Sequence, residues 1–345
     1  NKKKYVIDES FKIDETKLRD LIEERAVPLE QKAVNASASY NESGFDLTDE
    51  AEGYTVDIDK SVKKIKNFMN KKWNYEDAEV ELTLDTEDPA VKKTDLESLQ
   101  DELGSYSTNA GWGDRVQNLR RAAGLINGTV VMPGEEFSVE QTTLPYTEEN
   151  GYVAGSAYEN GQIVESIGGG LCQVSTTLYN AVLYAELEVT QRASHSMSVS
   201  YVDPSRDAMI AEGISDFKFV NNYDTPILIE GYIDSNNQLG FYIYGKDTRD
   251  AEHSVEFESE TLETTEYTTK YVEDTEAEIG SQETEGAGMD GSTARLWKVT
   301  YENGEEVSRE VINNSTYQTS DVTVKVGTKS DNAEATKLVR EAITT

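Results

Sequence analysis

Hydrophobic positions along the first hundred residues predict a mixture of helix and strand. Apolar side chains recur at helical spacing in Thr16–Arg25 and again in Ser61–Trp73, where lysines occupy the opposite face. Strict alternation of apolar and polar residues in Val80–Leu84 predicts a strand. Glycine, serine, threonine and asparagine then cluster in residues 104–113, which is typical of a boundary. We therefore expect an α+β module over residues 1–108.

The next region, residues 109–250, combines both patterns. Apolar stripes predict helices at residues 114–126 and at Val174–Glu186. Short alternating segments predict strands at Gln162–Ser166, Met197–Val202, Phe217–Val220, Ile227–Tyr232 and Leu239–Tyr244. Because Asn, Asp and Gly turns separate the last three strands, we expect an antiparallel sheet that packs on the second helix, in a mixed α/β domain.

The composition changes near Ala251, where Glu, Thr and Val become dominant and strand-like alternation continues. This pattern predicts a small all-β module over residues 251–328. The Asn303-Gly304 pair between two alternating segments predicts a tight hairpin turn. Residues 329–345 are expected to form a tail. The predicted fold class of the whole chain is therefore α+β and multidomain.

Charge narrows the possible partners. The chain carries 32 basic and 66 acidic residues, a formal net charge of −34. Such a surface repels phosphate backbones and anionic lipid, which argues against nucleic acid and direct membrane binding. No apolar run reaches the roughly 18 residues of a transmembrane helix. The sequence begins Asn1-Lys2-Lys3-Lys4, which we interpret as the basic flank of a removed signal or anchor segment, so we expect an extracytoplasmic location.

The chain has a single cysteine, Cys172, which follows a Gly-Gly-Gly-Leu turn at a predicted strand-to-helix junction. Free amides at a helix N-terminus stabilise a thiolate. The backbone near Gly169, Gly170 and Gln173 is a candidate for binding substrate or holding an oxyanion. The alternative is a glycine turn followed by a buried and inert cysteine.

His195 is one of only two histidines, and it lies in the segment after the predicted Cys172 helix. A cysteine at a helix start followed by a histidine is an arrangement that serves nucleophilic catalysis. The group that orients the imidazole has two candidates. Asp207 is the first and Asp216 is the second.

Arg192 and Ser194 are candidate substrate-binding residues, since an arginine suits a substrate carboxylate. The alternative for Arg192 is a surface charge. Ser196 and Tyr201 are further candidates for lining the site, and the sequence does not rank them. One cysteine and two histidines without a His-Glu-x-x-His pattern argue against a metal site, and no phosphate-binding loop occurs, so no cofactor is expected. Ser-x-x-Lys patterns at Ser61 and Ser215 lack the Lys-Thr-Gly partner of penicillin-binding proteins.

The central region resembles the VanW domain family. The matching stretches are NGTVVMPGEEFS at residues 127–138, GGGLCQVSTTL at 168–178, RASHSMSVSYV at 192–202, Asp207-Ala208 and DFKFVNN at 216–222. One departure is Pro204-Ser205-Arg206-Asp207, where the resemblance leads us to expect a glycine between proline and aspartate. Residues 5–105 resemble the peptidoglycan-binding module that often precedes VanW domains. Residues 255–328 resemble the glycine-punctuated β module that often follows them.

The resemblance implies a cell-wall enzyme similar to VanW-type L,D-transpeptidases, in which Cys172 matches the family cysteine and His195 the family histidine. Its expected partners are peptidoglycan stem peptides, and its expected product is a 3-3 cross-link made through a thioester. With water as acceptor, it is expected to act as an L,D-carboxypeptidase. The alternative is a non-catalytic wall-binding or adhesive protein, in which Cys172 is a packed core residue. The sequence leaves the oligomeric state open.

Overall fold

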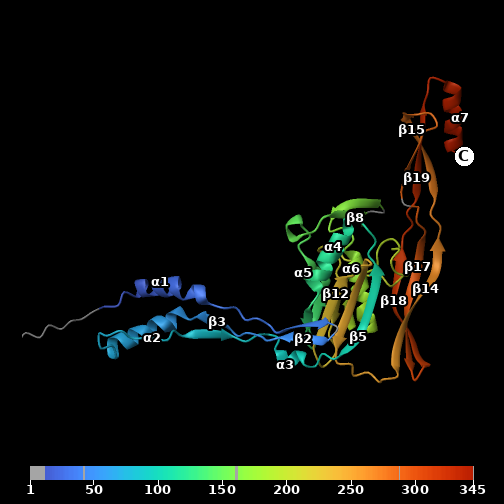
Figure 1. Cartoon of the computed structure of the whole chain (residues 1–345). Coiled ribbons are helices and arrows are strands. Elements are labelled where there is room, and N and C mark those ends of the chain that lie inside the picture. The colour runs from blue at the N-terminus through green and yellow to red at the C-terminus, as the bar shows by residue number, and fades with distance from the viewer. Residues whose placement is uncertain (1–11, 42, 160–161, 287, 345) are drawn as a thin grey trace, which may run out of the picture. The chain divides into compact units, whose positions relative to one another are not determined.

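The computed structural model describes residues 12–41, 43–159, 162–286 and 288–344 (Figure 1). The chain divides into two compact units. The first holds residues 1–38 and 46–97, and the second holds residues 39–45 and 98–345. No helix within the described ranges is both long and apolar enough to cross a membrane.

The first unit contains the predicted helices. α1 (Glu15–Arg25) agrees with the apolar spacing. α2 (Ile58–Lys71) begins before the predicted Ser61, because the Asp57 carboxylate accepts from the Lys60 amide at 2.8 Å and caps the helix there. The other elements up to residue 97 are η1 (Val27–Leu29), β1 (Ser37–Asn41), β2 (Gly44–Thr48), β3 (Gly53–Val56), β4 (Leu84–Glu87) and α3 (Lys93–Leu96), of which β1 and β2 lie partly in the second unit.

The strand predicted at Val80–Leu84 is wrong in its limits. Antiparallel pairing with β3 begins only at Leu84, where β4 starts. Thr83 instead donates its amide to the Ser61 hydroxyl at 2.8 Å, and its carbonyl accepts from the Asp57 amide at 2.9 Å. These bonds connect residues before Leu84 to the start of α2. This part of the predicted strand therefore has no strand partner among the described residues.

The second unit contains an antiparallel sheet whose strands lie in the order β5–β13–β12–β6. The predicted strands Ile227–Tyr232 and Leu239–Tyr244 pair in it, but Phe217–Val220, which was expected in the same sheet, pairs instead with Glu136–Ser138 and Glu188–Gln191 in a separate sheet. α4 (Arg115–Ile126) and α6 (Cys172–Tyr184) pack against this sheet and against each other, which confirms both predicted helices (Figure 1). The four strands are β5 (Asp101–Asn109), β6 (Thr129–Val131), β12 (Ile227–Ile233) and β13 (Gln238–Gly245).

β5 corrects the predicted boundary at residue 108. Composition assigns residues 101–108 to the N-terminal module, whereas the structure pairs them with β13 in the central sheet. Gly104 is not a linker residue. A Cβ there would lie 2.3 Å from the Ala185 amide nitrogen, so glycine allows β5 to approach the end of α6. The two structural units separate between Glu97 and Ser98.

Smaller elements surround the central sheet. The predicted strand at Met197–Val202 is wrong, because this segment is a loop that lies between β10 and β11. The predicted strand at Gln162–Ser166 is present as β9. The elements are β7 (Glu136–Ser138), α5 (Val139–Thr143), η2 (Glu148–Asn150), β8 (Ala154–Glu159), β9 (Gln162–Ile167), β10 (Glu188–Gln191) and β11 (Lys218–Val220).

The C-terminal part of the second unit is the predicted all-β module. Asn303 and Gly304 have φ angles of 53° and 78°, so the predicted tight hairpin turn is confirmed. The supposed tail forms α7 (Ala333–Ile343), which Asn332 caps. The strands are β14 (His253–Thr265), β15 (Thr269–Glu278), β16 (Gln282–Glu285), β17 (Gly291–Glu302), β18 (Glu305–Tyr317) and β19 (Val322–Lys329), in two sheets ordered β14–β17–β18 and β15–β19–β16.

Candidate active site

Cys172 is the first residue of α6 and follows a tight glycine turn. Gly168 and Gly170 have φ angles of 79° and 99°, in the left-handed region that glycine occupies without strain. A Cβ on Gly169 would lie 2.1 Å from the Gly155 carbonyl oxygen, so strand β8 passes directly against the turn. The three glycines therefore let the chain reverse in little space before the helix starts.

The loop after β10 brings His195 to Cys172. The Cys172 thiol donates to the Ile210 carbonyl oxygen at 3.3 Å, and His195 is its main charged neighbour. Burial raises the pKa of the Cys172 thiol, but the interaction with His195 outweighs burial, so the pKa lies below its ordinary value. Cys172 is partly exposed, whereas His195 is buried.

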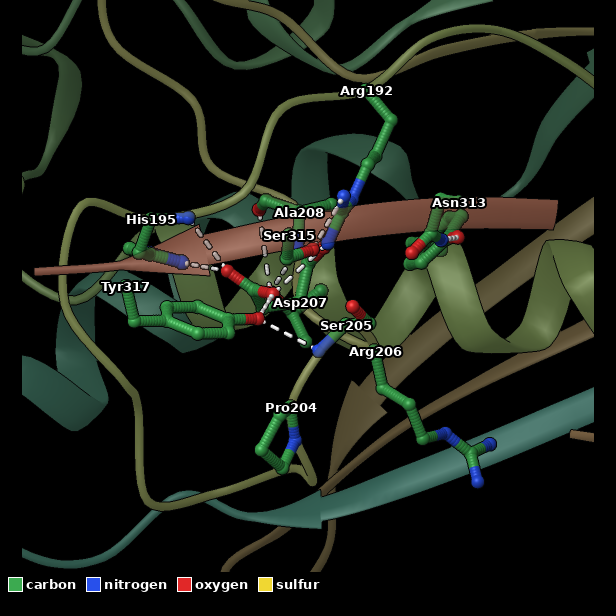
Figure 2. Close-up of polar contacts among 12 residues, drawn as sticks. Arg192, His195, Pro204, Ser205, Arg206, Asp207, Ala208, Asn313, Ser315 and Tyr317 are labelled. Carbon is green, nitrogen blue, oxygen red and sulfur yellow. Dashed lines mark hydrogen bonds and ion pairs between the residues drawn. The ribbon is translucent and has the colours of Figure 1, made fainter. Parts of the chain in front are cut away.

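Asp207 lies against the other side of the imidazole (Figure 2). Its Oδ2 atom is 2.6 Å from His195 Nδ1 and accepts from the His195 amide at 2.7 Å. Burial lowers the pKa of His195, but Asp207 and Cys172 more than offset burial and raise it to about 9. Burial likewise raises the pKa of Asp207, and its bonds to His195 lower it below the ordinary value. The structure thus brings together all three residues that the sequence proposed for catalysis.

These opposite shifts favour a thiolate paired with an imidazolium. The thiol loses its proton more easily than usual, while His195 holds one up to a pH of about 9. Because Nδ1 is occupied by Asp207, Nε2 is the ring nitrogen available to the sulfur. A thiolate is the nucleophilic form of cysteine, so this arrangement can attack a carbonyl carbon.

Polar residues of α6 hold the Asp207 loop. The Ser175 hydroxyl donates to the Ala208 carbonyl at 2.6 Å, and the Thr176 hydroxyl accepts from the Ala208 amide at 2.9 Å. Asn180 donates its side-chain amide to the Arg206 carbonyl at 2.8 Å. Because Cys172 starts the same helix, these bonds fix the aspartate relative to the cysteine. They also account for buried polar side chains along this helix.

Arg192, a predicted substrate-binding residue, makes hydrogen bonds within the protein. Its Nε donates to the Asp207 carbonyl at 2.7 Å, and its Nη2 donates to Asp207 Oδ1 at 3.0 Å. Its Nη1 donates to the Ser315 hydroxyl at 3.1 Å. The guanidinium is therefore committed to Asp207 and to strand β18, and it positions the aspartate. Ser194 lies partly exposed beside His195, and its role stays a prediction.

Gln173 also serves the fold rather than the substrate. It is fully buried, and its side-chain oxygen accepts from Arg115 at 3.0 Å. Its side-chain nitrogen donates to the Asn109 carbonyl at 2.8 Å, at the end of β5. Its backbone amide donates to the Gly170 carbonyl at 2.9 Å. None of its donors is left for an oxyanion, so this prediction is wrong.

The backbone amides of the glycine turn divide into two groups. The Gly169 amide donates to the Ser166 carbonyl at 2.9 Å, so the predicted role of Gly169 as a donor is wrong. The amides of Gly170 and Cys172 donate to no acceptor within the described part of the chain. Cys172 is the first residue of α6, and Gly170 lies two residues before it. Backbone amides at the start of a helix commonly lack helical partners. The Gly170 and Cys172 amides are the candidate oxyanion donors.

Asp216, the second candidate for orienting the imidazole, has another role. Its Oδ2 accepts from the Ser138 hydroxyl at 2.6 Å, and its Oδ1 accepts from the Glu140 amide at 2.9 Å. These bonds fix the start of α5. The choice between the two aspartates is therefore Asp207.

Two tyrosines lie near the sulfur. Burial raises the pKa of Tyr146 to about 12, and the charge of Cys172 adds to this effect. Burial and the same charge raise the pKa of Tyr201, which the sequence had proposed as a lining residue. Both phenols therefore stay protonated at neutral pH. Sequence reasoning missed Tyr146, because nothing in the pattern of residues 139–150 distinguishes a site residue from a core aromatic.

Ser205 stands where the family resemblance predicts glycine. Its φ angle is 66°, it is fully buried, and its hydroxyl has no hydrogen-bond partner among the described groups. Both features destabilise the folded state. We expect Ser205→Gly to raise the free energy of unfolding by about 1 kcal/mol in urea titrations, because glycine adopts this φ freely and removes the unpaired oxygen. A lower unfolding free energy in the variant would show that the serine hydroxyl stabilises the loop.

Comparison with known proteins agrees with this geometry. Residues 114–244, which contain Cys172, His195 and Asp207, match the family described as VanW like protein. The central part of this chain is therefore similar to the VanW family. Residues 256–329 match the G5 domain family, and residues 1–78 match the PG_binding_4 family, which is named for peptidoglycan binding. Together, the three families indicate association with the bacterial cell wall.

Two relatives align with parts of the chain. YoaR of Bacillus subtilis strain 168, described as uncharacterized, is 44% identical over 130 residues, which cover 37% of this chain and 43% of YoaR. The vancomycin B-type resistance protein VanW of Enterococcus faecalis V583 is 30% identical over 146 residues, which cover 39% of this chain and 53% of that protein. The chain thus spans about half the length of each relative.

Two solved structures are also similar to short parts of the chain. The IgA1 protease G5 domain is 25% identical, with a TM-score of 0.18, and the match covers 23% of this chain and 94% of that domain. The HP0197-G5 crystal structure is 10% identical, with a TM-score of 0.15, and the match covers 22% of this chain and all of that structure. Neither similarity bears on the site.

Proposed function

We propose that this chain is a cysteine-dependent L,D-transpeptidase that forms 3-3 cross-links between peptidoglycan stem peptides outside the cytoplasm. The observation that carries the proposal is the Cys172–His195–Asp207 array at the start of α6, with its lowered thiol pKa and raised imidazole pKa. The neighbouring match to a family named for peptidoglycan binding supports a wall substrate.

In the acylation step, the Cys172 thiolate forms a bond to the carbonyl carbon between diaminopimelate and the terminal D-alanine of a tetrapeptide stem. The carbonyl oxygen becomes an oxyanion, for which the amides of Gly170 and Cys172 are the candidate donors. The C–N bond then breaks, and the leaving amine takes the Nε2 proton of His195. D-Alanine departs and a thioester remains on Cys172.

In the deacylation step, the side-chain amine of a second diaminopimelate attacks the thioester carbon. His195 takes a proton from this amine, and the C–S bond breaks. The thiolate and the imidazolium are thereby restored, and the new amide bond is the 3-3 cross-link. Water as the acceptor gives an L,D-carboxypeptidase through the same steps.

The alternative is a non-catalytic wall-binding protein, and one assay separates it from the enzyme. The full chain is incubated with tetrapeptide muropeptides, and mass spectrometry follows D-alanine release and dimer formation. Dimers with D-alanine release support the transpeptidase, and D-alanine release alone supports the carboxypeptidase. If the muropeptides bind but neither product forms, the enzymatic proposal is wrong.

A further inference from the structure

We propose that Tyr317, which belongs to the C-terminal β module, is a positioning residue for Asp207 in the VanW domain. The module that carries it would then complete the catalytic array, in addition to any part in wall binding. The role of Tyr317 in catalysis rests on the proposed function. The effect of Tyr317 on Asp207 and His195 can be tested in protein that shows no turnover.

Tyr317 bridges two atoms of the Asp207 loop (Figure 2). Its hydroxyl donates to Asp207 Oδ1 at 2.6 Å and accepts from the Ser205 amide at 2.7 Å. The residue is almost fully buried, with 3% of its surface exposed. Asp207 Oδ2 is the atom that faces His195, whereas Oδ1 accepts from Tyr317 of the β module and from Arg192 of the VanW domain.

Other contacts show that the end of β18 follows this loop closely. Ser315, two residues before Tyr317 on the strand, accepts from Arg192 at 3.1 Å. The amide of Gln318 donates to the Ser196 carbonyl at 2.7 Å, directly after His195 in the chain. The family matches assign these partners to separate domains, residues 114–244 and 256–329. The β module thus contacts the segments on both sides of the His195–Asp207 pair.

The hydroxyl affects how strongly Asp207 holds the imidazolium. Burial and the charge of Asp207 raise the pKa of Tyr317 to about 12, so the phenol stays protonated and donates. The charged groups that face Asp207 are His195 and Arg192, and those that face His195 are Asp207 and Cys172. A donor on Oδ1 shares the negative charge of the carboxylate and so weakens its pull on the imidazolium proton. That proton must pass to the leaving amine.

The test is Tyr317→Phe in the full chain, which keeps the ring and removes the hydroxyl. Imidazole resonances are followed by NMR across pH, since the chain has only two histidines. The His195 midpoint is expected to rise by about half to one pH unit, because the carboxylate then loses one of the two donors on Oδ1 and stabilises the imidazolium more strongly. His253, which pairs with Glu186 and Glu302, is the internal reference and is expected to stay unchanged. Tyr271→Phe, at an exposed position of the same module, is the matched control.

An unchanged His195 midpoint in folded Tyr317→Phe would overturn the proposal, since a purely structural role would not alter this midpoint. The variant also leaves the Ser205 amide without its acceptor, which costs stability. If Tyr317→Phe does not fold, the same titration is made with Ser205→Gly as the reference and Ser205→Gly/Tyr317→Phe as the variant. An unchanged His195 midpoint in the folded double variant would likewise overturn the proposal.

Where wild-type protein shows turnover, kcat of Tyr317→Phe is expected to fall about three- to tenfold at unchanged KM. Absence of turnover would contradict the enzymatic proposal and leave the titration result valid.

Discussion

Replacing Cys172 by alanine is expected to abolish D-alanine release and muropeptide dimer formation, with a loss of about a thousandfold or more. The thiolate is the atom that bonds to the substrate carbonyl in the proposed mechanism, and the chain has no second cysteine to replace it. Mass spectrometry of reaction mixtures with wild-type and variant protein measures the difference. The thioester intermediate, detected as a mass increase on the intact wild-type chain, is also expected to disappear.

A folding control makes this result specific. Alanine keeps a small side chain at the start of α6, so urea unfolding of Cys172→Ala should lie close to that of the wild-type protein. Cys172→Ser keeps the shape but offers a hydroxyl, which His195 does not deprotonate in the resting state, so it is expected to be similarly inactive. Substantial dimer formation by folded Cys172→Ala would refute the cysteine mechanism.

The second large effect is expected for Asp207→Asn. The carboxylate accepts from the His195 amide, from Arg192 Nη2 and from the Tyr317 hydroxyl, and it faces His195 Nδ1. An asparagine must turn its NH2 group toward some of these donors, and it leaves the buried Arg192 charge without its counter-charge. We expect the free energy of unfolding to fall by about 3 kcal/mol or more. We expect kcat to fall by about a thousandfold, because the imidazole loses its orientation.

Asp203→Asn is the matched control for this variant. Asp203 lies in the same loop and is exposed, so its substitution is expected to change neither stability nor turnover. Urea titration and the D-alanine assay, applied to both variants, separate the loss of fold from the loss of chemistry. If Asp207→Asn retained turnover within a factor of about two, Asp207 would not be the residue that orients His195.

The sequence predicted the centre of the site because its evidence is local. The chain has a lone cysteine after a glycine turn and a histidine shortly after it. Such a pair can be interpreted from the order of the predicted helices and strands alone. The helices α4 and α6 and the strands β12 and β13 were also predictable, since their apolar spacing is regular, whereas β5 and β6 of the same sheet were not predicted. Asp207 was the first candidate for orienting the imidazole and Asp216 the second, and Asp207 is the one that contacts His195.

The sequence was less informative where the role of a residue depends on contacts with segments far away in the chain. Arg192 resembles a substrate-binding arginine in sequence, but its partners are Asp207 and Ser315, the latter far away in the chain. Met197–Val202 alternates like a strand, yet it forms a loop between β10 and β11. Tyr317 lies in a different family-defined module, so no local pattern connects it with Asp207.

The pairing of thiolate and imidazolium in the resting protein is tested most directly by the NMR titration of His195 in the wild-type chain and in Cys172→Ala. The account predicts a wild-type midpoint near pH 9 and a decrease of about one unit or more in the variant, because the Cys172 thiolate contributes to raising the pKa of His195. A wild-type midpoint near the ordinary value of about 6.5 that is the same in both proteins would contradict it.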